Sequence, residues 1–222
     1  YQTKYFLADG DTVIATYRDE AEASELFALQ KEHEGRCHTV QGDITVDAEV
    51  ENFRTFAEAI VPAIDILVNN AGIDIEQANP GIEEVGIDLL EHVFAVNTLG
   101  TVRVCKALLP LVRKSALPTR GLIANTTSGL ASMSNPVMMT RYGYMMSKVS
   151  INMLSRGMAF EFGENGPTVV AWSPGWVQTR LGTPAATYTL DEGGRGNVTT
   201  LKSITRDQSG KVIDMSGEEW SF

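Results

Sequence analysis

The stretch Tyr144-Met145-Met146-Ser147-Lys148 opens a long segment, residues 144–162, that contains no proline and one glycine. Apolar residues recur through this segment at helical spacing, which predicts an α-helix. In a helix, Tyr144 and Lys148 lie one turn apart on the same face. An ammonium beside a phenol favours the phenolate, so we expect the pKa of Tyr144 to fall below its usual value of about 10. Such a tyrosine can exchange a proton with a reacting oxygen near neutral pH.

A Tyr-x-x-x-Lys spacing also occurs by chance on ordinary helix faces, so the flanking sequence has to decide between the two interpretations. On both sides of this segment, β-rich runs alternate with helical ones. Strands are expected at residues 12–17, 38–41, 64–70, 121–126, 168–172 and 210–214, and helices at 1–8, 19–34, 47–61, 89–113 and 144–162. Residues 182–197 are rich in Gly, Thr and Pro and are expected to form a mobile loop.

This alternation predicts a doubly wound, Rossmann-like α/β fold, with a parallel sheet covered by helices on both faces. No internal repeat or linker divides the chain, so we expect one domain over residues 1–222. Folds of this class bind their ligands at the carboxyl ends of the strands. The site is therefore expected among the residues that follow each strand.

The bulk composition narrows the class of partner. With 222 residues and a net charge of −10, the chain is unsuited to nucleic acid or an anionic membrane as its main partner. Its two cysteines and three histidines show neither a disulfide framework nor metal-ligand spacing, so no metal is expected. No apolar run of transmembrane length and no signal peptide are visible, which makes a reducing, cytoplasmic location the expectation.

Five short motifs occur in one order along nearly the whole chain. They are Asn69-Asn70-Ala71-Gly72 after a strand, Asn97 within residues 95–98, Thr127-Ser128 after a strand, Tyr144-x-x-x-Lys148, and Pro174-Gly175-Trp176-Val177-x-Thr179. Each motif is weak alone, but together they resemble the short-chain dehydrogenase/reductase family. The long gap between Ser128 and Tyr144, the Pro-Gly-Trp-Val form and a tail ending near Trp220 resemble its C-factor/sniffer-like carbonyl reductase branch.

The resemblance implies a catalytic set of Asn97, Ser128, Tyr144 and Lys148. Tyr144 would give a proton to the oxygen of a carbonyl that receives hydride, and Ser128 would hydrogen-bond the same oxygen. Lys148 would lower the pKa of Tyr144 and hold the nicotinamide ribose, and Asn97 would support a water that relays protons to Lys148. Structural interpretations stay open: Ser128 could cap a turn, and Asn97 could mark a helix kink.

The resemblance also implies a nicotinamide dinucleotide. Tyr17 stands where an acid would select NAD, and Arg18 follows it, which favours the 2′-phosphate of NADP. Asp19 would reverse this preference if the alignment shifted by one residue. The remaining expected cofactor contacts, besides Tyr144 and Lys148, are Asp43 and Ile44 at the adenine, Asn70, Ala71 and Gly72 behind the cofactor, and Pro174, Gly175, Val177 and Thr179 near the carboxamide.

The family begins with a strand and a Gly-x-x-x-Gly-x-Gly turn ahead of its first helix, and Tyr1 is expected to lie inside that helix. The first strand and the turn that binds pyrophosphate are therefore expected to be absent. Two functions remain open: an NADP-dependent carbonyl reductase of a small molecule, or a truncated, redox-inactive family member that binds or signals. A dehydratase or epimerase is the weaker third reading. The family implies a homo-oligomer formed through the helices at residues 89–113 and 144–162.

Overall fold

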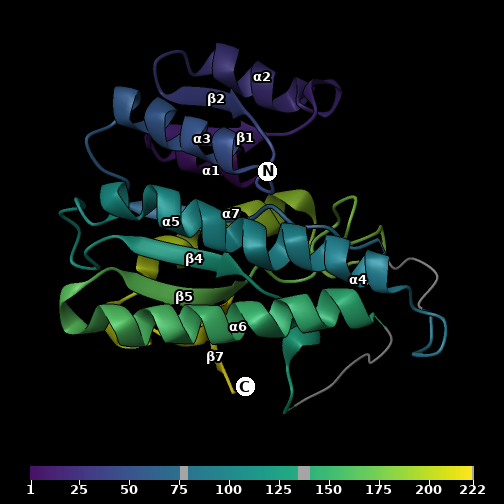
Figure 1. The fold of residues 1–222 in the computed structure, drawn as a ribbon. Coiled ribbons are helices and arrows are strands. Elements are labelled where there is room, and N and C mark those ends of the chain that lie inside the picture. The colour runs from purple at the N-terminus through teal and green to yellow at the C-terminus, as the bar shows by residue number, and fades with distance from the viewer. Residues whose placement is uncertain (76–79, 135–140, 222) are drawn as a thin grey trace.

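The computed structural model describes residues 1–75, 80–134 and 141–221. Its strands form two sheets, β1-β2 and β3-β4-β5-β6-β7, and every pairing is parallel except that of β6 with β7. The strands are β1 (Val13–Tyr17), β2 (Cys37–Gln41), β3 (Ile66–Asn69), β4 (Leu122–Thr126), β5 (Thr168–Ser173), β6 (Val212–Asp214) and β7 (Glu219–Trp220). Figure 1 shows β1, β2 and β4 running in the same direction.

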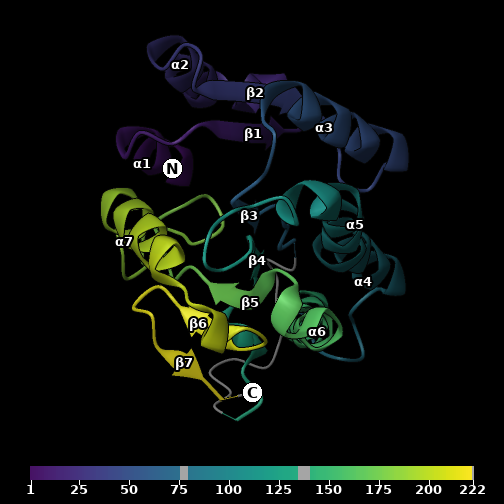
Figure 2. The ribbon, with the colours of Figure 1, turned by 90° about the vertical axis from the view of Figure 1, so that its left-hand side faces the viewer.

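Helices cover both faces of these strands. Figure 2 shows α1 and α7 on one face and α3, α4, α5 and α6 on the other. Their bounds are α1 (Gln2–Ala8), α2 (Ser24–Glu32), α3 (Asp47–Ile60), α4 (Ile87–Phe94), α5 (Thr101–Val112), α6 (Tyr142–Phe162) and α7 (Leu190–Ser203). The predicted doubly wound α/β fold is confirmed.

The buried side chains follow from the helical period. In α3, Val50, Phe53 and Ala57 recur on one face and are buried against the sheet. They join one hydrophobic cluster with Leu108 of α5 and Ile123 of β4. The strands β4 and β5 are buried on both faces, which is why they read as continuous apolar runs in the sequence.

Several expected boundaries were wrong. Half of the expected loop at residues 182–197 is the beginning of α7, which starts with a capping box in which Thr189 and Glu192 bond reciprocally to backbone groups. The expected helix at residues 19–34 is a short 3-10 turn, Glu20–Glu22, followed by α2. The strand β7 was not predicted, because two residues carry too little periodicity.

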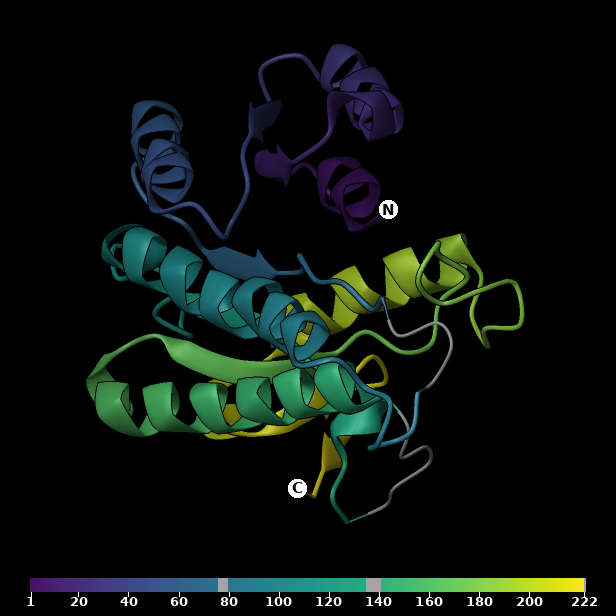
Figure 3. The same cartoon turned by 45° about the vertical axis from the view of Figure 1, so that its right-hand side comes forward.

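A cavity of about 620 Å³ separates the two sheets between β1 and β3. It is lined by residues 13–16 of β1, by residues 64–71 around β3, and by side chains of α1, α3 and α5. Figure 3 shows the β1-β2 unit with its helices standing apart from the larger sheet. Within the described residues, each of these two strands therefore has one edge without a strand partner.

The β1-β2 unit and its helices, called the N-terminal unit below, are tied to the larger sheet through helix contacts and ion pairs. Lys202 of α7 lies 2.7 Å from Asp9 and 2.6 Å from Asp11, and Arg103 of α5 lies 2.7 Å from Asp47. Ile44 packs on Gly100, where an added Cβ would come within 2.6 Å of the isoleucine side chain. These contacts fix the end of β2 beside the α4–α5 helix.

The helix through Ile87–Val112 is long and apolar enough, by length and composition, to cross a membrane. Half of its most apolar window is buried inside the protein, against α3 and α6. The apolar residues are thus those of a core helix. The expectation that no apolar segment reaches transmembrane length was wrong, because this helix reaches it by length and composition. The chain turns through a π-helical segment, Ala95–Gly100, between α4 and α5.

Candidate active site

Tyr144, Ser128 and Lys148 meet beyond the carboxyl end of β4. Tyr144 lies in the first turn of α6, is buried, and shares a side-chain hydrogen bond with Ser128. Ser128 also accepts a hydrogen bond from the backbone N–H of Leu130 at 3.2 Å, so it caps the turn that follows β4. Lys148 Nζ lies 5.6 Å from the centre of the Tyr144 ring. The catalytic and the capping interpretations of Ser128 therefore both describe its contacts.

Burial is the main cause of the pKa shifts of Lys148 and Tyr144. Lys148 is 3% exposed, and its Nζ donates a hydrogen bond to the Thr126 carbonyl at 2.8 Å. Burial lowers the pKa of Lys148 to about 8 and raises the pKa of Tyr144, while the Ser128 hydrogen bond opposes the latter shift. The expected fall in the pKa of Tyr144 was wrong, because removal of the phenol from water outweighs nearby favourable groups.

Asn97 lies in the π-helical turn and is fully buried. Its Oδ1 accepts a hydrogen bond from the Ile73 N–H at 2.7 Å, and its Nδ2 donates to the Ile73 carbonyl at 2.9 Å and to Ser147 Oγ at 3.0 Å. The side chain thereby fixes the segment after β3 against α6. The described contacts give Asn97 a structural role, and the water relay stays a prediction.

Gly72 brings the segment after β3 close to the same group. A Cβ at this position would lie 3.2 Å from Asn97 Oδ1 and 3.4 Å from Lys148 Nζ. Gly72, Asn97 and Lys148 are therefore neighbours. Asn70 and Ala71 precede them, are exposed, and line the cavity between the sheets.

The residues expected at the adenosine end follow β1 and β2. Arg18 is exposed directly after β1, and no ion pair of its guanidinium occurs within the described ranges. The neighbouring Asp19 caps a 3-10 turn by accepting a hydrogen bond from the Ala21 N–H at 2.9 Å. Asp43 accepts hydrogen bonds from the Thr45 hydroxyl and N–H, which lower the pKa of its carboxyl. The Asp19 side chain is thus engaged in capping the turn, and Arg18 presents an exposed positive charge beside it.

The residues expected near the carboxamide follow β5. Gly175 has a φ of +77°, a conformation that favours glycine. The carbonyl of Pro174 accepts a hydrogen bond from Asn197 of α7 at 3.1 Å. Val177 is buried and its carbonyl accepts from the Thr179 N–H at 2.7 Å, so both residues lie in a tight turn. These segments also begin at the carboxyl end of a strand, at the same edge of the sheet as Ser128.

The family model described as short chain dehydrogenase matches residues 2–189 of this sequence. The chain belongs to the short-chain dehydrogenase family. Membership makes it an oxidoreductase by class, and it is consistent with the placement of the five motifs around one edge of the sheet.

Individual relatives differ in how much of their length is matched. The chain is 33% identical to C-signal of Myxococcus xanthus, over 75% of this chain and 98% of that protein. It is 30% identical to the uncharacterized oxidoreductase YxbG of Bacillus subtilis, over 79% of this chain but only 61% of that protein.

Solved structures agree on the fold. The carbonyl reductase Sniffer of D. melanogaster superposes with a TM-score of 0.89 at 23% identity, covering 96% of this chain and 88% of that one. An NADPH-bound carbonyl reductase from chicken fatty liver gives a TM-score of 0.87 at 26% identity, with the same shares covered. The first of these similarities is evidence of the fold alone.

Under the site of this short-chain dehydrogenase lies a buried polar chain that sequence reasoning missed. Asn69 Nδ2 donates to Asn125 Oδ1 at 2.8 Å, and Asn125 Nδ2 donates to Ser155 Oγ at 3.0 Å. All three side chains are buried, so this chain fixes β3, β4 and α6 in register below the reactive group. Sequence spacing carries no signal for such long-range pairs.

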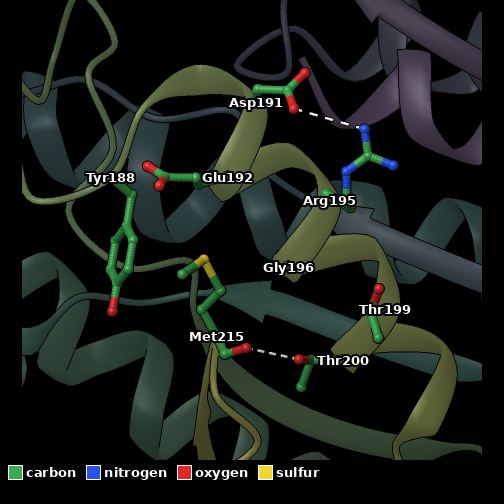
Figure 4. Close-up of a pocket in the computed structure, with 8 residues that line it drawn as sticks. All are labelled: Tyr188, Asp191, Glu192, Arg195, Gly196, Thr199, Thr200 and Met215. Atoms are coloured by element: carbon green, nitrogen blue, oxygen red, sulfur yellow. Dashed lines mark hydrogen bonds and ion pairs between the residues drawn. The ribbon is translucent and has the colours of Figure 1, made fainter.

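A second cavity, of about 560 Å³, lies beside α7 and is lined by Tyr188, Asp191, Glu192, Arg195, Gly196, Thr199, Thr200 and Met215 (Figure 4). None of Ser128, Tyr144 and Lys148 lines it. Tyr188 and Met215 lie within 4 Å of a Cβ placed on Gly175, so the cavity borders the turn after β5. It is a neighbour of the short-chain dehydrogenase site and does not contain the reactive group.

Proposed function

We propose that this chain is an NADP-dependent oxidoreductase that reduces the carbonyl of a small molecule, or oxidises the corresponding alcohol, as a single cytoplasmic domain. The observation that carries the proposal is the buried Tyr144 hydroxyl, hydrogen-bonded to Ser128 with the Lys148 ammonium one helical turn away. Membership of the short-chain dehydrogenase family and the similarity to an NADPH-bound carbonyl reductase support it.

The residues of this chain suit the reduction of a carbonyl. The nicotinamide, when bound, supplies the hydride. Negative charge then develops on the carbonyl oxygen, where the Tyr144 hydroxyl donates its proton and the Ser128 hydroxyl donates a hydrogen bond. The raised pKa of Tyr144 keeps the phenol protonated at neutral pH, as an acid requires. Lys148, held at the Thr126 carbonyl, places a positive charge near the Tyr144 ring and can hold ribose hydroxyls.

Two ends of a dinucleotide fit the described residues. At the nicotinamide end, Gly72 leaves room beside Lys148 that a side chain would fill. At the adenosine end, Arg18 offers an exposed guanidinium, which suits the two charges and three oxygens of a 2′-phosphate. With Asp19 occupied as a cap, the preference is for NADP over NAD.

Arg18→Gln should weaken NADPH binding by about tenfold or more and leave NADH binding unchanged, because only NADPH carries the phosphate that the guanidinium pairs with. Fluorescence titration of the reduced nicotinamides measures both constants. Lys31→Gln, an exposed cation in the same N-terminal unit, is the matched control and should change neither. Equal losses for both cofactors in Arg18→Gln would mean that the residue does not select NADP.

The reaction itself is tested with a panel of aldehydes and ketones, by following NADPH oxidation at 340 nm. NADPH deuterated at nicotinamide C4, prepared as each of its two epimers, should transfer deuterium to the carbonyl carbon of the product from one epimer only. Oxidation of NADPH without deuterium in the product would contradict a carbonyl reductase.

A second function, as a redox-inactive signalling or binding protein, is favoured by one observation: the 33% identity with C-signal extends over 98% of that protein. This alternative predicts that Tyr144→Phe leaves a signalling activity intact, whereas the reductase proposal predicts that turnover is lost.

We also propose that the enzyme forms a homo-oligomer through α6. Met146, Met153 and Phe160 repeat every seventh residue along this helix and are 47%, 69% and 91% exposed. Two such stripes can pack on each other as helix pairs do.

Light scattering after size exclusion should find Phe160→Glu as a monomer and the wild type as a dimer or larger, because the substitution introduces a charge into an apolar contact. Glu164→Lys, an exposed change just beyond α6, is the control. A monomeric wild type at micromolar concentration would rule out this interface.

A further inference from the structure

Asp74 and Arg141 form an ion pair beside the reactive tyrosine, although 67 positions separate them in the sequence. Asp74 follows the Gly72 turn after β3, and its side chain is 6% exposed. Arg141 is the N-cap residue of α6, three positions before Tyr144. A carboxylate this deeply buried is costly to the fold unless a cation compensates it, and Arg141 provides that compensation.

Backbone hydrogen bonds beside each residue of the pair connect it to the candidate active site. The preceding residue, Ile73, is held through both backbone groups by Asn97. The carbonyl of Arg141 accepts a hydrogen bond from the Met145 N–H at 2.8 Å, which closes the first turn of α6. The ion pair therefore links the segment that backs the nicotinamide end to the helical turn that carries Tyr144.

Building on the proposed function, we propose that Asp74 and Arg141 act as a positioning pair, which holds the first turn of α6 against the segment after β3 and balances the charge around the Tyr144 hydroxyl. Neither residue belongs to the five motifs, and neither needs to touch substrate for this role. The pair acts through Tyr144.

Among the described residues, four groups from three elements act on the phenol: Lys148 and the N-cap residue Arg141 of α6, Ser128 after β4 and Asp74 after β3. Asp74 raises the pKa of Tyr144 and Arg141 lowers it. Because the two charges act in opposite directions, removing one of them exposes the effect of the other. A merely structural contact would instead respond in the same way to the loss of either partner.

The test is a pH titration of tyrosine Cζ by ¹³C NMR, with the Tyr144 signal assigned by its loss in Tyr144→Phe. Asp74→Asn, which keeps the side-chain shape, should lower the pKa of Tyr144, and Arg141→Gln should raise it. The double variant should return close to the wild-type value. Shifts of the same sign in both single variants, or no shift in either, would overturn the proposal.

Two further variants separate charge from folding. Arg141→Lys keeps the positive charge, so its Tyr144 titration should lie closer to that of the wild type than to that of Arg141→Gln. Asp65→Asn, an exposed carboxylate at the opposite end of β3, should leave the Tyr144 signal unchanged. Circular dichroism on every variant verifies the fold.

The activity arm uses the same variants. The alkaline limb of kcat/KM for carbonyl reduction should move to lower pH in Asp74→Asn and to higher pH in Arg141→Gln, following the Tyr144 titration. Absence of turnover in the wild type would count against the proposed function and not against the pair, because the NMR titration still decides whether the two charges tune Tyr144.

Discussion

Replacing Tyr144 by phenylalanine should lower kcat for carbonyl reduction by about 10²–10⁴-fold, the usual contribution of a positioned general acid. The substitution removes one oxygen, the atom that shares the hydrogen bond with Ser128 and that donates the proton. The ring remains and continues to fill its buried place, so the fold and the affinity for NADPH should stay close to wild type. Steady-state kinetics with NADPH and a carbonyl substrate measures the loss.

Tyr142→Phe is the matched control, because it makes the same change two residues earlier in the same helical turn at a half-buried position. It should keep nearly the full rate. A Tyr144→Phe protein with unchanged kcat would remove Tyr144 from the chemistry, whatever its surroundings suggest.

Replacing Lys148 by methionine should abolish turnover and, at the same time, raise the free energy of unfolding at pH 7 by about 1–2 kcal/mol. Folding moves the pKa of this ammonium from 10.5 to about 8, so the folded state disfavours the charged form by roughly 3 kcal/mol. Methionine removes this cost but leaves the Thr126 carbonyl without its donor, which offsets about 1 kcal/mol. Urea unfolding at several pH values measures the gain.

The same pKa shift makes the stability gain of Lys148→Met depend on pH. Between pH 8 and pH 10.5, the unfolded chain holds a proton on Lys148 that the folded chain has released, so wild-type stability rises with pH across this window. The advantage of Lys148→Met should therefore be full below pH 8 and disappear near pH 10.5. Lys148→Arg keeps a charge and should show no such gain. A methionine variant less stable than wild type at pH 7 would contradict the buried, destabilising ammonium.

The parts of the site that depend on local sequence were predictable. Tyr144 and Lys148 occupy one helix face because of the helical period, and Gly72 and Ser128 follow strands whose apolar runs are plain in the sequence. The capping box at Thr189 was readable as well, but the surrounding glycines and threonines outweighed it in the prediction of a loop. Helix α7 forms because its cap and its packing on α1 override weak intrinsic propensity.

The remaining features depend on pairs that are distant in the chain. The Asp74–Arg141 ion pair and the Asn69–Asn125–Ser155 hydrogen bonds arise only after strands and helices have assembled. The raised pKa of Tyr144 has the same origin, because it reflects how completely the fold buries the phenol. A sequence shows which charges are neighbours on a helix, and it does not show how much water surrounds them.

The most direct test of the proposed function is the binding of NADPH to this 222-residue chain, titrated by nicotinamide fluorescence with NADH in parallel. We predict saturable binding with a dissociation constant at least about tenfold lower for NADPH than for NADH, because Arg18 pairs with the phosphate that only NADPH carries. No saturable binding of either nucleotide would contradict the NADP-dependent activity proposed for this chain and would favour the signalling function instead.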